Sequence, residues 1–128
     1  MIERNPHNQL NGVNQAPVPA GNRSWPPGLL HYVATKGAVI SVTRSLASEF
    51  APDNVLVNAV SPGFTPPQDA SVSAELVERF AEQAIKTRLI KRNATPEDVA
   101  NVIYFLAGPD SGFVTGQVIV ADGGSVLH

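Results

Sequence analysis

The sequence predicts an α/β protein, in which helices cover the faces of a parallel β-sheet. Two observations carry this prediction. Between residues 31 and 121 the patterns run in the order helix, strand, two helices, strand. Both expected strands are short apolar runs without alternation, which is typical of strands buried on both faces. Because helices separate the strands, each connection is long enough to bring the next strand back parallel.

The composition of the 128 residues is that of a soluble globular domain, with 43% hydrophobic and 16% charged residues. A net charge of -2 gives no reason to expect a nucleic-acid partner or an anionic membrane surface. Without cysteine there is neither a disulfide framework nor a thiolate metal site, and we expect no metal. No apolar run approaches the roughly 20 residues of a membrane-spanning helix, and residues 1–6 lack the apolar stretch of a secretory signal. We therefore expect a cytoplasmic protein.

The chain divides near residue 30. Residues 1–28 are rich in proline and asparagine, which remove backbone donors and favour turns, so neither helical nor strand periodicity is expected there. We interpret residues 1–29 as an irregular arm and residues 30–128 as the α/β domain.

The domain begins with a helix over residues 31–50, which contain no proline. Its recurring positions at intervals of three and four are Tyr32, Lys36, Val39, Thr43, Leu46 and Phe50. Residues 51–54 end this helix, and residues 55–60 form an apolar, β-branched run interrupted by one asparagine. That run predicts a strand buried on both faces.

A second helix is expected over residues 69–88, with one apolar face made of Leu76, Val77, Phe80, Ala81, Ala84 and Ile85. A third begins with Thr95 as N-cap and Pro96 at the first helical position, and ends before Gly108. Residues 117–121 are the last strand.

Tyr32 and Lys36 are the residues that suggest chemistry. Spaced four apart, they lie one turn from each other on the same helix face. A phenol with a pKa near 10 is a poor base at neutral pH, but a nearby ammonium would lower that pKa. The pair would then be a usable proton donor and acceptor. Taken alone, the same spacing also suits a ring at the edge of the core and a solvated charge.

The surrounding motifs favour the chemical reading. After the Tyr-x-x-x-Lys motif come seven others in a fixed order, at residues 37–39, 46–49, 57–63, 95–100, 105–107, 115–117 and 122–124. Together they resemble the C-terminal half of the short-chain dehydrogenase/reductase family, over about residues 30–125. The resemblance implies the C-terminal part of a Rossmann-like doubly wound parallel sheet, without the N-terminal dinucleotide-binding strands.

The resemblance also implies roles. Tyr32 would exchange a proton with an alcohol or carbonyl substrate while hydride passes to or from NAD or NADP. Lys36 would lower the pKa of that tyrosine and hold the nicotinamide ribose. Pro62, Gly63 and Thr65 would flank the nicotinamide, although Pro62 and Gly63 also suit a plain strand-ending turn. Residues 69–88 fall where the family has a lid over the substrate, and they equally suit an ordinary amphipathic helix. To the turn at residues 122–124 we assign no chemistry.

The sequence also departs from the family pattern in two places that bear on function. Its members are about twice as long and begin with a glycine-rich turn that binds the pyrophosphate, which is missing here. The catalytic serine, expected about a dozen residues before the tyrosine, is also missing, since residues 17–21 contain none. We therefore expect a truncated chain that binds little NAD or NADP alone and is inactive unless a complementing N-terminal half is supplied. The alternative is a non-catalytic remnant or an oligomeric assembly module.

An assembly state follows from the same reasoning. If the first strands are missing, residues 55–60 would leave backbone groups unpaired at a sheet edge, and such edges recruit other chains. In the family the helix at residues 31–50 contributes to a subunit interface, and its small residues allow close helix packing. We expect a homo-oligomer with helix 31–50 or strand 55–60 at the contact.

Overall fold

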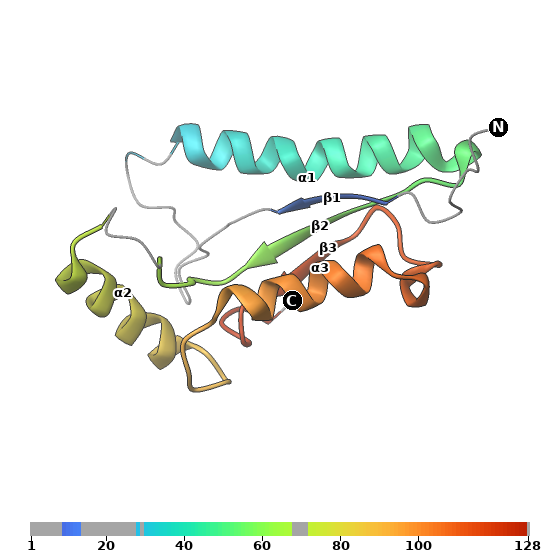
Figure 1. Cartoon of the computed structure of the whole chain (residues 1–128). Coiled ribbons are helices and arrows are strands. Elements are labelled where there is room, and N and C mark those ends of the chain that lie inside the picture. The colour runs from blue at the N-terminus through green and yellow to red at the C-terminus, as the bar shows by residue number, and fades with distance from the viewer. Residues whose placement is uncertain (1–8, 14–27, 29, 68–71, 128) are drawn as a thin grey trace.

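The computed structural model describes residues 28, 30–67 and 72–127 and the backbone of residues 9–13. This part of the chain forms three strands and three α-helices (Figure 1). They are β1 (Gln9–Val13), α1 (Leu30–Phe50), β2 (Leu56–Pro62), α2 (Ala74–Thr87), α3 (Pro96–Ala107) and β3 (Val118–Ala121). Short 3-10 turns at Ala51–Asp53 and Pro109–Ser111 follow α1 and α3. The α/β class predicted from the sequence is confirmed.

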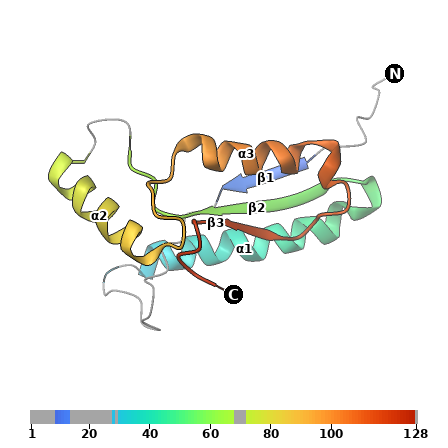
Figure 2. The ribbon, with the colours of Figure 1, turned by 90° about the horizontal axis from the view of Figure 1, so that it is seen from below.

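The sheet is parallel, with the strand order β1-β2-β3 (Figure 2). Gly12 of β1 lies opposite Ala59 of β2, and Val60 of β2 lies opposite Ile119 of β3. Strand β2 is therefore central and paired on both sides.

This pairing corrects two expectations. The irregular arm is wrong for residues 9–13, which form β1, and the unpaired edge predicted for residues 55–60 does not exist. Gln9, Asn11 and Gly12 give this strand little intrinsic β preference, but hydrogen bonding to a buried neighbour can override propensity. The rest of the predicted arm, apart from residue 28, lies outside the described residues, and so does the proposed boundary at residue 29.

Helices cover both faces of the sheet. Figure 1 shows α1 along one face and α3 along the other, the arrangement of a doubly wound fold. On α1 the residues that turn inward and become buried are Thr43 and Ala47, and on α3 it is Leu106. In the sheet the buried apolar residues are Val57, Ala59 and Val60, all in β2. This strand is therefore enclosed on both faces as predicted.

Asn58, the polar residue in the middle of β2, is fully buried and satisfied. Its Nδ2 donates to the backbone oxygen of Val114 at 2.8 Å, and its Oδ1 accepts from the backbone N–H of Gln117 at 3.1 Å. Nearby, the backbone N–H of Val57 donates to Oγ1 of Thr115 at 3.1 Å. A buried amide without partners would be costly, so Asn58 fixes the segment that leads into β3.

The last two helices differ in how well the sequence predicted them. Helix α3 starts at Pro96 as expected, and the carboxylate of Asp98 accepts a hydrogen bond from the backbone N–H of Thr95 at 2.8 Å. Helix α2 starts at Ala74 rather than 69, and residues 69–71 are not described. Its predicted apolar face is only partly covered: Ala81 is buried, whereas 41% of Leu76 and 47% of Phe80 is exposed.

Candidate active site at the carboxyl end of the sheet

The residues predicted to carry chemistry come from two elements, and both groups lie at one end of the molecule. Tyr32 and Lys36 lie in the first two turns of α1, and Pro62, Gly63 and Thr65 lie at the end of β2 and in the loop after it. Figures 1 and 2 both show the start of α1 and the carboxyl end of β2 at the same end of the molecule. Ligands of open α/β sheets bind outside the carboxyl ends of the strands, so this position suits a binding site.

Lys36 lies beside the ring of Tyr32, as the four-residue spacing predicts. Its Nζ is 5.6 Å from the centre of the ring, within the range of a cation–π interaction. Both side chains are partly exposed. Burial nevertheless raises the pKa of Tyr32 above its ordinary value. The lowering of this pKa predicted from the sequence is therefore not found in the chain as it stands.

The loop after β2 is held against the end of β3. The backbone N–H of Gly63 donates to the oxygen of Ala121 at 3.0 Å. A Cβ on residue 63 would lie 2.8 Å from the Cα of Asp122, so only glycine fits there without a shift of the backbone. Oγ1 of Thr65 donates to the oxygen of Gly63 at 3.2 Å. Packing within the chain thus accounts for the glycine, as the plain-turn interpretation requires.

Sequence reasoning missed Arg88, which follows α2 and lies behind this loop. It is only 2% exposed. Its Nη2 donates to the backbone oxygen of Phe64, and its Nη1 donates to that of Arg92 at 3.2 Å. Desolvation lowers the pKa of Arg88, and the nearby charge of Asp122 opposes that effect. A lone arginine after an amphipathic helix carries no sequence signal of burial, because such residues are mostly solvated.

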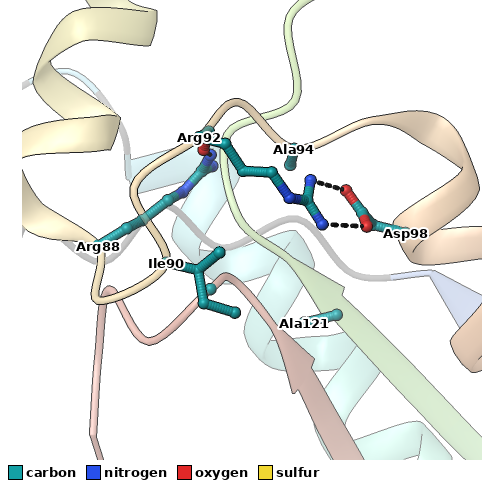
Figure 3. A pocket seen from close by; sticks show the side chains of 7 residues that line it. Arg88, Ile90, Arg92, Ala94, Asp98 and Ala121 are labelled. Carbon is teal, nitrogen blue, oxygen red and sulfur yellow. Dashed lines mark hydrogen bonds and ion pairs between the residues drawn. The ribbon is translucent and has the colours of Figure 1, made fainter.

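A cavity of about 140 Å³ lies beside Arg88 (Figure 3). Its lining residues are Arg88, Ile90, Arg92, Ala94, Asp98, Ala121 and Gly123. Arg92 is held on the far wall by Asp98, with 2.6 Å from Nη1 to Oδ2 and 2.6 Å from Nη2 to Oδ1. Neither Tyr32 nor Lys36 lines this space, so it is separate from the predicted catalytic pair.

The turn at residues 122–124 is fixed by hydrogen bonds within the chain. The carboxylate of Asp122 accepts hydrogen bonds from the backbone N–H groups of Gly124, Ser125 and Val126, at 2.8, 3.2 and 3.0 Å. Gly123 and Gly124 have φ angles of 69° and 77°, a region that favours glycine. These residues therefore shape the chain end and support the loop at Gly63.

The part of the chain that the structure describes holds no group of three or more His, Cys, Asp or Glu side chains that could bind a metal ion. It also has no helix that is both long and apolar enough to cross a membrane.

Comparisons with known proteins agree with this geometry. Residues 13–126 match the sequence model of a family described as enoyl-(acyl carrier protein) reductase. A 3-oxoacyl-[acyl-carrier-protein] reductase of Thermotoga maritima is 44% identical over 101 residues, which are 79% of this chain and 40% of the relative.

Two solved structures extend the comparison. A short-chain dehydrogenase/reductase from Brucella melitensis is 35% identical with a TM-score of 0.72, over 92% of this chain and 46% of the other. A short-chain dehydrogenase from Leptospira borgpetersenii with bound NAD⁺ is 26% identical with a TM-score of 0.69, over 91% and 44%. The chain thus spans less than half the length of these relatives. With its parallel sheet and its Tyr32–Lys36 pair at the carboxyl end, the chain belongs to the short-chain dehydrogenase/reductase family of oxidoreductases.

Proposed function

We propose that this chain supplies the proton-transfer half of an NAD(P)-dependent oxidoreductase site that interconverts an alcohol and a carbonyl compound. The observation that carries the proposal is the Tyr32–Lys36 pair at the carboxyl end of the sheet, with Nζ 5.6 Å from the ring centre. The Leptospira relative binds NAD⁺, and the Thermotoga relative is a reductase of 3-oxoacyl groups, which contain a ketone. These two relatives support a nicotinamide cofactor and a carbonyl substrate for the proposed reaction.

Each residue has a role that its position allows. A bound nicotinamide would supply hydride to the carbonyl carbon or accept it in the reverse direction. The phenol of Tyr32 donates its proton to the carbonyl oxygen, so that carbon gains hydride and oxygen gains a proton to give the alcohol. The ammonium of Lys36 stabilises the phenolate that remains. In the resting chain burial raises the pKa of Tyr32, which favours the protonated phenol needed for reduction.

The described residues fit only the nicotinamide end of the cofactor. Lys36 would bind the ribose, and Pro62, Gly63 and Thr65 would flank the ring and its carboxamide. Within the described ranges no glycine-rich turn joins a strand to a helix in the way that cradles a pyrophosphate. We therefore propose that high affinity for NAD or NADP requires a second, complementing segment.

A second candidate function, a homo-oligomeric assembly module, is supported by the surface of α1. Four small residues of this helix, Ala34, Gly37, Ala38 and Ser41, are exposed. A Cβ at Gly37 would meet no atom within 4 Å, so space for a neighbouring helix is open. Small residues allow close helix–helix approach, and α1 replaces β2 as the proposed contact because β2 is already paired on both sides.

One experiment tests the catalytic proposal. The full chain is titrated with NADH and with NADPH by calorimetry, first alone and then with the N-terminal part of the Thermotoga reductase that this chain does not match. We expect no micromolar binding by the chain alone, and binding plus oxidation of the reduced cofactor by a 3-oxoacyl thioester in the mixture. A stable two-chain complex that shows no hydride transfer with either cofactor contradicts the proposal. Micromolar binding by the chain alone contradicts the need for a second segment.

A further inference from the structure

Arg88 joins three segments that are far apart in the sequence. From the end of α2 its guanidinium reaches the oxygen of Phe64 in the loop after β2 and the oxygen of Arg92. Its aliphatic stem packs against the turn after β3, since a Cβ at Gly123 would lie 3.3 Å from its Cδ. Backbone bonds from the N–H groups of Leu89 and Ile90 to the oxygen of Gly123, both 3.0 Å, hold the same contact.

Burying this side chain is expensive, which argues that its hydrogen bonds have a specific use. Arg88 is 2% exposed, and its Nε has no hydrogen-bond partner among the described residues. A buried cation destabilises a fold unless it is well compensated, and an apolar side chain of similar volume would fill the space at lower cost. The planar fork of a guanidinium can, however, grip two carbonyl oxygens in fixed directions, which an apolar side chain cannot do.

Arg88 binds the loop after β2, which the proposed function places against the nicotinamide. This binding is called the grip of Arg88 on the loop. The two residues Gly63 and Phe64 are held at both ends, by the bond from the Gly63 N–H to the oxygen of Ala121 and by the bond from Arg88 to the Phe64 oxygen. The ring of Phe64 lies 6.0 Å from that of Phe80 in α2. The conformation of Gly63 and Phe64 sets the direction in which the backbone groups of Gly63 and Thr65 point.

We propose that Arg88 is a positioning residue, which fixes the backbone of residues 62–65 in the conformation that receives the nicotinamide ring. Its use in binding rests on the proposed function, whereas its grip on the loop does not. The two parts are therefore measured separately.

The grip is measured by hydrogen–deuterium exchange on the full chain without cofactor. Arg88→Met removes both donors and keeps an apolar stem, and Arg88→Lys keeps the charge and loses the fork. Arg79→Gln, at an exposed position of α2, is the matched control. We expect exchange in peptides covering residues 62–67 to accelerate about 10-fold or more in Arg88→Met and less in Arg88→Lys, with α1 and β2 still protected.

If amide exchange in residues 62–67 is unchanged in both Arg88 variants, Arg88 does not hold the loop. Equal acceleration in Arg79→Gln has the same meaning. If Arg88→Met does not fold, Arg88→Lys alone decides the result. The use in binding is read from the complex with the Thermotoga N-terminal part. There Arg88→Lys should lower kcat and raise KM for the cofactor, so that kcat/KM for the cofactor falls roughly 10-fold. KM for the thioester should stay unchanged. An active wild-type complex in which Arg88→Lys has no effect overturns the positioning role, whereas an inactive wild-type complex contradicts only the proposed function.

Discussion

Gly63 lies so close to Asp122 that a Cβ on residue 63 would stand 2.8 Å from the Cα of Asp122 and 2.9 Å from its Cβ. Both of these atoms belong to Asp122, whose turn is fixed by the three hydrogen bonds to its carboxylate. The loop after β2 and the turn after β3 therefore form one packed unit.

Gly63→Ala should lower the free energy of unfolding by about 1–3 kcal/mol, because the new methyl group forces the backbone apart. Gly37→Ala is the matched control, since its Cβ would meet nothing within 4 Å in the middle of α1. There alanine should raise stability by about 0.5–1 kcal/mol. Urea denaturation of the three chains measures both values. Equal effects of the two substitutions would show that the contact at Asp122 is not restrictive.

Tyr32→Phe and Lys36→Ala should separate proton transfer from cofactor binding in the two-chain complex. Loss of the phenol removes the proton donor and should reduce kcat roughly 10²–10⁴-fold, with KM for the cofactor nearly unchanged. Loss of the ammonium should lower kcat and raise that KM, because Lys36 is proposed to touch the ribose as well. Steady-state kinetics with both cofactors make the comparison. A rise in KM of the same size in both variants would refute this division of roles.

Asp98→Asn should remove part of the acid sensitivity of the fold. Hydrogen bonds from Arg92 and from the backbone of Thr95 hold the pKa of Asp98 well below its ordinary value near 3.9. The folded state thus binds the proton less tightly than the unfolded state. The stabilisation is complete above the ordinary value and is lost as the pH falls below it.

Melting temperatures measured from pH 7 to pH 2 test this prediction. Asp98→Asn should melt at a lower temperature than the wild type at pH 7, and the gap should shrink as the pH falls. Glu97→Gln, at the neighbouring exposed position, is the control and should leave the profile unchanged. A gap that stays constant across the range would mean that Asp98 acts through packing rather than charge.

The double substitution Ala34→Arg with Ala38→Arg should dissociate the proposed oligomer. The two alanines are exposed one turn apart on α1, so arginines there would block close approach and place like charges in the contact. Light scattering at micromolar concentration should show an oligomer for the wild type and a monomer for the variant. Ala100→Arg, on the exposed side of α3, should leave the mass unchanged. A folded wild-type monomer would exclude the assembly.

Local patterns were enough to predict four of the six elements closely. The unbroken periodicity of residues 31–50 predicted α1, and the apolar runs predicted β2 and β3 to within two residues at each end. Thr95 and Pro96 marked the start of α3. Such patterns succeed because helix spacing, strand burial and capping depend on residues a few positions apart. The order of these elements also determined the α/β class, and the Tyr-x-x-x-Lys spacing placed Lys36 beside Tyr32.

Tertiary structure alone decided the remaining features. Residues 9–13 carry no strand pattern, yet they pair with β2 because that strand offers a row of unpaired backbone groups. Arg88 resembles a solvated charge, yet packing of the turn at Gly123 buries it against Phe64. The pKa of Tyr32 rises because burial disfavours the charged form of its hydroxyl group. Each outcome depends on segments brought together from distant parts of the chain, whereas a sequence pattern records only what neighbouring residues require of one another.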